Sequence, residues 1–582
     1  MSPSFLDYRI SPSNVYAIIC HRRLHGHEQY LVRWHSNHPD NAVISWHTLK
    51  ELRECLHLVQ DYVKVALSGP RPPPTTPIND AKNDNTNNSK DRKGGRKRKL
   101  LDDGDLSSSA SSGYSKDSSY SSVSSSKSAR HEVYNGILQR KAGHLIAKES
   151  HVSDPSIPHI MNVSSLPDAA MLSEASNTSV YAALWQIRLV FLKQISRLPG
   201  PAKLTFCNNL DLETPSLHFR WVQDYVLGQG VSKMDDETIL GCSKCKPDMG
   251  ARRGCEYTQK CDCLEYAEPD PSKAMTESQQ AIYEVYLVDR STDTTGLPKR
   301  FPYINTGPRA GCLDRFYLES RYVIYECNHK CRCGPKCKTR NVQFGRKVDL
   351  EIFKTANRGF GLRALEPLRK GQFIDKYLGE LITDEEADRR ETLQTSASSY
   401  LFWLDKHMIS DPNDKEAEAK SEYPAFSDGG PPRQKDCYVA DSTLIGGPTR
   451  YINHSCEPNC RLFTVSYNKS DQRIYDLAFF ALEDIEKGEE LTFDYVDPDV
   501  DDEEEDVNED DTSIEDEDLA MWERGSGRRG TGAADAAAAA SSKGNVVNSN
   551  SATRTLGSSG GKKKQTVSCH CGAARCRGVM WE

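Results

Sequence analysis

The apolar residues of the first 66 positions follow two patterns in turn. The stretches NVYAIICHRR and EQYLVRWHS are rich in strand-forming residues and are joined by the turn-like LHGH. In the following segment, ISWHTLKELRECLHLVQDYVKV, the apolar residues recur at helical spacing, at Leu49, Leu52, Leu56, Val59 and Val63. Residues 8–66 are therefore predicted to form a small barrel-like module of two or three strands with a C-terminal helix.

Beyond residue 66 the pattern changes several times. VYAALWQIRLVFLKQISRL (180–198) is predicted to be a helix, and residues 200–496 have the pattern of strands and loops with many cysteines. Two segments dominated by polar and small residues are expected to be disordered, because neither can bury enough apolar surface to fold. They are residues 67–178, which are basic and Ser-rich, and residues 497–565, which are acidic and then rich in Gly, Ala and Ser.

Composition narrows the class of protein. A chain of 582 residues suggests several domains, and the apolar share of 37% indicates that part of it is unfolded. The N-terminus lacks a charged region followed by an apolar run, and no run approaches 18 apolar residues, so we expect neither a signal peptide nor a membrane partner. The 19 cysteines should therefore be reduced, and clustered ones are better interpreted as metal ligands.

Charge is segregated along the chain. Residues 501–518 hold 13 acidic side chains and no basic one, so removing them from the net charge of −8 leaves +5 for the rest. A basic run, KDRKGGRKRK (90–99), lies in the first expected linker. Both tracts can be solvated disordered segments. The functional interpretation of the basic run is nuclear import together with contact to nucleic acid.

Three groups of cysteines stand out. The first two hold nine thiols: Cys242, Cys245, Cys255, Cys261 and Cys263, then Cys327, Cys331, Cys333 and Cys337. Zinc takes four ligands in structural sites, so nine thiolates serve three zincs if three sulfurs bridge. Separate four-ligand sites with one spare cysteine are the alternative. In either arrangement protein fills every ligand position, so the predicted role is structural.

The third group, Cys569, Cys571 and Cys576, is one ligand short of a closed zinc site. His570 or a cysteine elsewhere could complete it. Cys456 in RYINHSCEPNC (450–460) is one such cysteine, and the long intervening loop is no obstacle because closure cost grows slowly with length. With His454 two residues away, Cys456 could instead be a nucleophile, or both could merely pack.

Several of these stretches resemble a known family. RYINHSCEPNC, GEELTFDYV (488–496), ANRGFGLRA (356–364) and GQFIDKYLGE (371–380) resemble a SET domain. The nine-cysteine segment resembles a pre-SET domain, CHCGAARCRG a post-SET domain, and the N-terminal module a chromodomain. This order looks like the heterochromatin histone H3 lysine-9 methyltransferases in their fungal form. The resemblance covers residues 8–66 and about 200–582, apart from the acidic linker.

The resemblance implies a fold and a domain order. The expected fold is mainly β (α+β), a SET-domain β-fold with pre-SET and post-SET zinc modules and a small N-terminal barrel. The expected segments are a chromodomain-like module (8–66), a linker (67–178), a helix and strands flanking the pre-SET module (179–240), the pre-SET zinc cluster (241–340), the SET domain (346–496), a second linker (497–565) and the post-SET zinc module (566–582).

The resemblance also assigns the site. It implies that Cys456 joins Cys569, Cys571 and Cys576 on one zinc, which leaves it unsuited to act as a nucleophile. Tyr495 is implied to be the catalytic tyrosine, with Tyr400 as a second one that also contacts the cofactor. The residues implied to bind S-adenosylmethionine are Arg358, Gly359, Phe360, Tyr400, Arg450, Asn453 and His454. Phe493, where the family has Phe or Tyr, implies a trimethylating enzyme, since it has no hydroxyl to hold a water.

The chromodomain resemblance leaves the reader function open. A methyl-lysine reader needs an aromatic cage around the quaternary ammonium. Trp34 matches one wall of the cage, but Asn37 stands at the next position and Ser13 near the first, where Tyr8 and Tyr16 are the alternative aromatic residues. The alternative is that Tyr30, Trp34 and Trp46 form the core of a small barrel.

The sequence therefore predicts an S-adenosylmethionine-dependent methyltransferase acting on lysine 9 of histone H3, with four zincs, in nuclear heterochromatin. Its expected partners are the histone H3 tail or nucleosome and, through the basic linker, nucleic acid; the silencing-complex partners are unknown. A chromatin-bound scaffold with a non-catalytic SET domain is the alternative. A zinc-finger DNA-binding protein is a third, but the chain lacks the Cys and His spacing of classical fingers.

Overall fold

The computed structural model describes fifteen segments of the chain: residues 10–24, 26–35, 42–68, 138–141, 144–147, 166–233, 236–243, 262–290, 292–320, 322–333, 337–393, 400–407, 437–467, 472–496 and 567–581. They fall into two compact units, residues 1–189 and 190–582, and each is described by itself. No helix in these segments is both long and apolar enough to cross a membrane.

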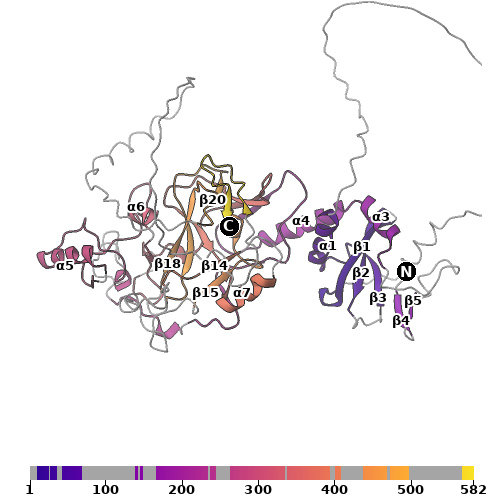
Figure 1. The fold of residues 1–582 in the computed structure, drawn as a ribbon, viewed down its shortest axis with the longest axis horizontal. Coiled ribbons are helices and arrows are strands. Elements are labelled where there is room, and N and C mark those ends of the chain that lie inside the picture. The colour runs from indigo at the N-terminus through magenta and orange to yellow at the C-terminus, as the bar shows by residue number, and fades with distance from the viewer. Residues whose placement is uncertain are drawn as a thin grey trace, which may run out of the picture. The chain divides into compact units, whose positions relative to one another are not determined.

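The first unit is built on an antiparallel sheet (Figure 1). After the short 3₁₀ turn η1 (Pro12–Asn14), strands β1 (Val15–Leu24), β2 (His27–Trp34) and β3 (Ala42–Thr48) pair in order. Helix α1 (Leu56–Ser68) follows, and its Val59 and Val63 are buried as the apolar spacing requires. The predicted strands and C-terminal helix are therefore present.

The helix begins later than the apolar spacing suggested. Residues 49–54 form turns, although Leu49 and Leu52 continue the helical periodicity. The carboxylate of Glu51 accepts hydrogen bonds from the backbone amide and the hydroxyl of Thr48, at 2.7 and 2.9 Å. The backbone amides of Glu51 and Leu52 also donate to the carbonyl of Thr48 and close turns here, and the regular helix begins only at Leu56.

Part of the expected linker 67–178 is ordered. Strands β4 (Leu138–Lys141) and β5 (His144–Ala147) extend the sheet beyond β3. Helix α3 (Ala169–Asn177) is capped by Asp168 and packs its Met171 and Ala175 with Cys20, Leu31 and Ile44 of the sheet. The expectation of disorder is wrong over residues 166–178. A segment with only a few apolar side chains can fold when a neighbouring sheet supplies the rest of the hydrophobic core.

Helix α4 (Tyr181–Ile195) corresponds to the predicted helix 180–198. The carboxylate of Glu28 accepts hydrogen bonds from the first amides of this helix, those of Ala182 and Ala183, at 2.8 and 3.1 Å. Near its other end Phe191 is fully buried, 5.2 Å from the ring of Phe206.

In the described part of the second unit the strands form three larger sheets and two small ribbons. The first sheet has the order β17 (Asn453–His454), β20 (Glu490–Phe493), β11 (Phe360–Ala364), β10 (Leu350–Lys354), β6 (Leu204–Cys207). The second is β12 (Phe373–Tyr377), β19 (Asp476–Ala481), β18 (Cys460–Ser466), β9 (Ile324–Tyr325), and the third is β14 (Leu401–Trp403), β15 (Tyr438–Asp441), β13 (Glu380–Thr383), β8 (Val226–Leu227). The ribbons are β16 (Ile445–Gly446) with β7 (Arg220–Trp221), and β21 (Val567–Ser568) with β22 (Val579–Trp581).

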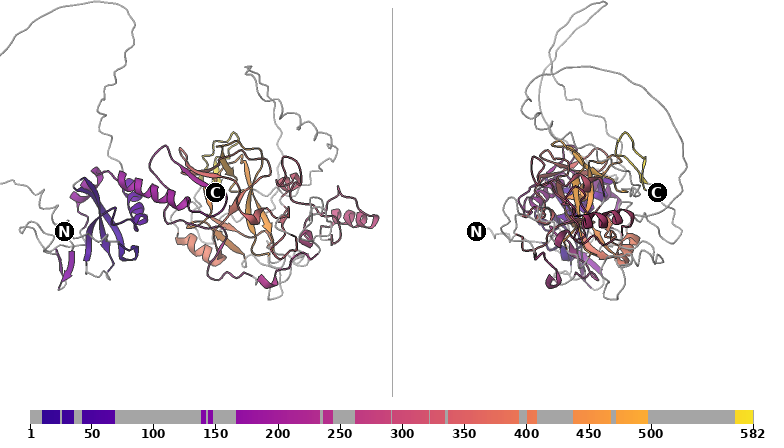
Figure 2. Two further views of the ribbon diagram at one scale, coloured as in Figure 1. Left: turned by 180° about the vertical axis from the view of Figure 1, so that it is seen from behind. Right: turned by 90° about the vertical axis from the view of Figure 1, so that its left-hand side faces the viewer.

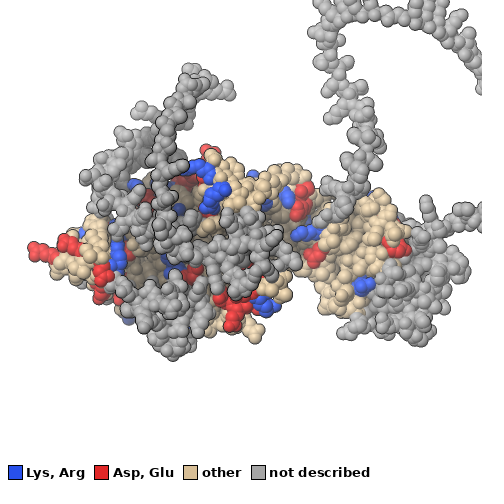
Figure 3. Space-filling view, in the orientation of Figure 1, with Lys and Arg blue, Asp and Glu red and all other residues tan. Residues whose placement is uncertain are grey.

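The helices of the second unit lie at its edges, whereas the strands gather in the middle (Figures 1 and 2). They are α5 (Glu277–Val288), α6 (Arg315–Glu319) and α7 (Asp384–Leu393), with 3₁₀ turns η4 (Asp236–Thr238), η6 (Asp262–Leu264), η7 (Val342–Phe344) and η9 (Pro448–Tyr451). Charged side chains of both signs gather over α7 in Figure 3, where Glu386 pairs with Arg389 and Arg390. The mainly β architecture is the one expected.

A shared core joins the cysteine-rich segment to the strands that follow it. Tyr303, Tyr317 and Ile324 pack in one buried cluster with Phe373 and Phe480. The segments before and after residue 340 therefore fold as one body, because neither covers its apolar face alone.

Candidate active site and zinc centres

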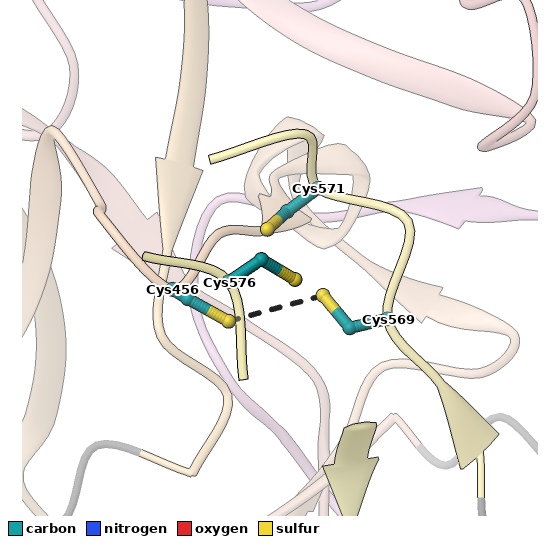
Figure 4. Close-up of side chains that lie close together, drawn as sticks. All are labelled: Cys456, Cys569, Cys571 and Cys576. Atoms are coloured by element: carbon teal, nitrogen blue, oxygen red, sulfur yellow. Dashed lines mark hydrogen bonds between the residues drawn. The ribbon is translucent and has the colours of Figure 1, made fainter. Parts of the chain in front are cut away.

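Four cysteine sulfurs converge where the C-terminal tail meets the segment after β17 (Figure 4). The Sγ atoms of Cys456, Cys569, Cys571 and Cys576 all lie within 4.8 Å of one another, and those of Cys456 and Cys569 are 3.9 Å apart. Sulfurs on a tetrahedral zinc with bonds of about 2.3 Å stand about 3.8 Å apart. Four thiols at this separation fit a closed zinc site.

The described cysteines of the pre-SET-like segment form two overlapping groups. The sulfurs of Cys263, Cys327 and Cys331 lie within 4.8 Å of one another, and so do those of Cys327, Cys333 and Cys337. Cys327 belongs to both groups, as a bridging thiolate would. Cys242 contributes its backbone amide to the sulfur of Cys331 at 3.3 Å, whereas Cys245, Cys255 and Cys261 lie outside the described residues.

Arg340 supplies positive charge to this cluster, although the sequence pattern did not single it out. Its Nη2 donates to the sulfur of Cys333 at 3.4 Å and to the carbonyls of Asn328, Cys331 and Cys333 at 2.8–3.3 Å. A cluster of thiolates carries excess negative charge, so a half-buried guanidinium beside it lowers the free-energy cost of assembling the cluster.

Strands β17 and β20 bring the two most specific motifs together. They pair in parallel, with Asn453 opposite Thr492 and His454 opposite Phe493. Residues 453–454 and 493–495 are therefore neighbours in space, although about forty residues of chain separate them.

His454 is a buried hydrogen-bonding centre at this junction. Its Nδ1 accepts the backbone N–H of Tyr495 at 3.1 Å, and its Nε2 lies 3.3 Å from the sulfur of Cys456. Burial lowers its pKa, against the opposing influence of Asp494, so the ring is neutral. Because Nδ1 is an acceptor, the proton of the neutral ring is on Nε2 and faces the sulfur.

Tyr495 retains 36% of its surface but turns its hydroxyl inward, where it donates to the carbonyl of Ile452 at 2.8 Å. Burial of this hydroxyl, followed by the influence of Tyr400, raises its pKa well above the ordinary value. The ring of Phe493 lies 4.7 Å from that of Tyr495 and 5.0 Å from that of Phe479. Tyr495 is therefore protonated, and its ring packs in a row of aromatic rings with Phe493 and Phe479.

Glu490 links two of the predicted cofactor residues and was missed by sequence reasoning. Its carboxylate forms an ion pair with Arg358 and accepts from Asn453 Nδ2 at 2.8 Å. Asn453 also donates to the carbonyl of Phe360 at 3.3 Å, and Arg358 donates to the carbonyl of His454 at 3.3 Å. The available signal was a carboxylate at the start of a strand, directly before the buried Leu491, where a charged group usually has a partner of opposite charge.

Arg450 and Tyr400 form a second part of the site. The guanidinium of Arg450 lies 4.2 Å from the Tyr400 ring centre and 4.7 Å from that of Phe219, and its Nε donates to the carbonyl of Ser442 at 2.9 Å. These stacked contacts fix the orientation of the guanidinium. Phe219, which precedes the cysteine-rich segment, was not predicted to matter here.

Gly359 adopts a left-handed conformation with φ +71°, which favours glycine, and a Cβ there would meet nothing within 4 Å. The guanidinium of Arg450 and the aromatic rings of Phe360 and Tyr400 offer a cation and flat surfaces for a ligand with a carboxylate and a purine. Two buried hydroxyls beside Arg450, of Ser442 and Thr443, have no hydrogen-bond partner in the described part of the chain. These residues fit S-adenosylmethionine.

The first unit places its predicted cage residue in the core. Trp34 is only 6% exposed, its Nε1 donates to Ser45 at 2.7 Å, and its ring packs edge-on to His47. Tyr16 is 59% exposed and contacts His35 edge-on at 5.4 Å, while Tyr8 and Asn37 lie outside the described residues. The geometry favours the core interpretation of Trp34.

Comparison with known proteins identifies the domains. The SET domain family matches residues 359–496 and the Pre-SET motif residues 199–340, which begins ahead of our expected boundary at 241. The chain is 39% identical over 311 residues to the H3 lysine-9 specific histone-lysine N-methyltransferase KMT1 of Fusarium mangiferae, covering 52% of this chain and 82% of that protein. It is 38% identical over 282 residues to dim-5 of Neurospora crassa, covering 48% and 73%.

A solved structure of the Neurospora SET domain protein DIM-5, a histone lysine methyltransferase, aligns with 51% of this chain and 95% of its own at 35% identity, with a TM-score of 0.40. The sequence matches and the site together define a SET-domain protein with a pre-SET module. The chain belongs to the H3 lysine-9 specific histone-lysine N-methyltransferases.

Proposed function

We propose that this chain methylates lysine 9 of histone H3 up to the trimethyl state, with Tyr495, Tyr400 and Phe493 forming the lysine channel. The chain is a histone-lysine N-methyltransferase specific for lysine 9 of H3, as its relatives are. The observation that carries the proposed channel is the inward hydroxyl of Tyr495 beside Phe493 and His454.

S-adenosylmethionine, when bound, supplies an electrophilic methyl group on its sulfonium sulfur. Arg358, Gly359, Phe360, Arg450, Asn453 and His454 would hold it together with Tyr400. Glu490 orients Arg358 and Asn453 through its carboxylate, and the stacked rings orient Arg450. Their role is to fix the cofactor so that nitrogen, methyl and sulfur can align.

The attacking lysine must be neutral, but a free lysine has a pKa of about 10.4, so its neutral form at pH 7 costs about 4–5 kcal/mol. An aromatic channel in which Tyr495 stays protonated gains no negative charge from that residue and disfavours the ammonium by desolvation. Because the Tyr495 O–H donates to Ile452, the phenolic oxygen keeps lone pairs that can accept an N–H of the amine. This contact directs the nitrogen lone pair toward the methyl group.

Phe493 offers no hydroxyl to hold a water beside the amine. An apolar wall there leaves room for a nitrogen that already carries methyl groups, which supports the trimethyl product. The edge-on contact with Phe479 and the tilted contact with Tyr495 hold this ring in place.

We also propose four zincs, three in the pre-SET cluster and one on Cys456, Cys569, Cys571 and Cys576. The shared Cys327 and the fourfold sulfur group support this count. The zincs are structural: they hold the tail and the cysteine-rich segment, since protein ligands fill their coordination.

The enzyme acts on chromatin, and we place it in nuclear heterochromatin. Histone H3 is its substrate, and a nucleosome is the proposed physiological form. The basic run 90–99, which lies outside the described residues, is proposed to contact nucleic acid. Methyl-lysine reading by the first unit has weaker support, since Trp34 is buried.

Incubation of purified protein with S-adenosylmethionine and an H3 tail peptide, followed by mass spectrometry, tests the proposal. Mono-, di- and trimethylated lysine 9 should appear in sequence, and a peptide with Arg at position 9 should stay unmodified. A protein that binds zinc and cofactor but transfers no methyl group would be the non-catalytic scaffold.

A further inference from the structure

Two arginines flank Cys576 in the C-terminal tail, and each pairs with a carboxylate of the SET domain. Arg575 Nε lies 2.8 Å from Glu457, which also accepts the backbone amide of Ala574 at 3.0 Å. Arg577 Nη2 lies 2.6 Å from Asp494 Oδ1. The tail is thus held by ion pairs on both sides of a zinc-ligand cysteine.

The two pairs differ in burial and in what they touch. The side chains of Arg575 and Glu457 are 90% and 35% exposed, so solvent screens their attraction. Those of Arg577 and Asp494 are 36% and 10% exposed. Asp494 stands between Phe493 and Tyr495 in the sequence, whereas Glu457 follows Cys456.

The Arg577 pair belongs to a closed ring of contacts. The backbone amide of Arg577 donates to the sulfur of Cys456 at 3.4 Å, and that sulfur lies 3.3 Å from His454 Nε2. His454 Nδ1 accepts the amide of Tyr495 and is 3.5 Å from Asp494 Oδ1. The ring passes from tail to cysteine, histidine and Asp494, and then back to the tail.

The electrostatics of Asp494 agree with this arrangement. Burial tends to raise the pKa of its carboxyl, but the ion pair with Arg577 and the backbone amide of Val496 lower it below the ordinary value. Without Arg577, a largely buried carboxylate would remain beside the backbone that carries Tyr495. Such a group is costly and moves toward solvent or another donor.

We propose that Arg577 is a positioning residue: by pairing with Asp494, the docked tail holds the Phe493–Tyr495 segment in its catalytic position. The zinc site fixes the position of the tail, and the Arg577–Asp494 ion pair in turn fixes the position of the backbone beside Tyr495. Tail docking and alignment of the lysine channel are therefore one coupled event. This inference rests on the proposed role of Tyr495.

The experiment compares Arg577→Gln with Arg575→Gln in the full chain, two substitutions of the same kind two residues apart. Steady-state kinetics with an H3 peptide and S-adenosylmethionine are measured together with zinc content and amide hydrogen exchange of residues 567–581. Arg577→Gln should lower kcat by about tenfold, because a small misplacement of an aligning group is costly. Zinc content should be unchanged, and Arg575→Gln should stay within about twofold of the wild type.

Two further variants separate positioning from general loss of structure. Arg577→Lys keeps the charge and should restore part of the lost kcat. Asp494→Asn combined with Arg577→Gln should be no worse than the poorer single variant, because partners in one interaction are not additive. Hydrogen exchange at Val496 and Tyr495 should rise in Arg577→Gln.

Each outcome bears on the inference. Equal kcat for Arg577→Gln and wild type, or equal losses in both arginine variants, would overturn it. Loss of zinc in Arg577→Gln alone would also overturn it, since the residue would then act on metal binding. A wild-type chain that transfers no methyl group to H3 would instead refute the proposed function, and the exchange at residues 494–496 would still report whether the pair exists.

Discussion

The backbone amide of Tyr495 donates to Nδ1 of His454 across 3.1 Å, and the opposite nitrogen of the same ring lies 3.3 Å from the sulfur of Cys456. One neutral imidazole therefore connects the proposed catalytic tyrosine to the proposed tail zinc. This relationship explains how a cysteine next to a histidine can serve catalysis without being a nucleophile. Its sulfur faces three other sulfurs and the Nε2–H of His454.

Tyr495→Phe removes only the hydroxyl that donates to Ile452. We expect kcat to fall by about 100-fold or more, because the amine loses the group that aligns it, while thermal unfolding stays close to that of the wild type. Radiolabel transfer to an H3 peptide measures the first and calorimetry the second. Tyr322→Phe, in the segment before the SET domain, is the control and should keep full activity. A Tyr495→Phe variant with wild-type kcat would remove the assigned role.

Phe493→Tyr adds a hydroxyl to the wall formed with Phe479 and Tyr495. The hydroxyl can hold a water where the third methyl group would lie, so products should shift from trimethyl toward monomethyl and dimethyl lysine. Mass spectrometry of the H3 peptide at long times measures the distribution. If trimethyl lysine accumulates as in the wild type, Phe493 does not select the product.

Cys456→Ser and Cys569→Ser should each remove about one zinc per chain, because the tail site loses one of four thiolates. Both should lose activity to the same extent, with residues 567–581 becoming labile to exchange. Cys460→Ser is the matched control: this fully buried thiol lies four residues from Cys456 but outside the sulfur groups. Metal analysis that finds full zinc in either of the first two variants would refute the shared site.

Glu490→Gln keeps the shape of the side chain but removes the charge that pairs with Arg358. We expect KM for S-adenosylmethionine to rise by about tenfold, equivalent to about 1.4 kcal/mol, with KM for the H3 peptide nearly unchanged. Glu489→Gln, one residue earlier and hydrogen-bonded to Asn459 and Glu486, is the control. An equal rise in both KM values would mean that Glu490 supports the fold in general.

Trp34→Ala should destabilise the first unit by about 3–5 kcal/mol, because it empties a buried site and leaves Ser45 without its donor. Tyr16→Ala, at an exposed ring, should change stability little. Thermal unfolding and titration with a trimethylated lysine-9 peptide measure both effects. If Trp34→Ala abolishes binding while the unit melts as in the wild type, Trp34 is a cage wall after all.

Much of the architecture could be read from local patterns. The apolar spacing located α1, α4 and strands β1 and β2, and the cysteine spacings predicted metal ligands as a class, because zinc needs several thiols close together in the chain or the fold. The apolar spacing did not locate the start of α1, which follows the turns of residues 49–54, or the packing of α3 on Cys20 and Leu31. Both depend on partners that periodicity does not encode.

What the sequence by itself determined is which residue types are present at which spacing: the thiols, the tyrosines and the NHSC and FDY motifs. The tertiary structure decided which of them meet. Cys456 reaches Cys569 across 113 positions, Glu490 pairs with Arg358 across 132, and Arg450 stacks on Phe219 from a segment ahead of the cysteines. Contacts of this kind depend on strand register and buried packing, which are properties of the whole folded core, because a side chain's spacing along the chain fixes only its nearest neighbours.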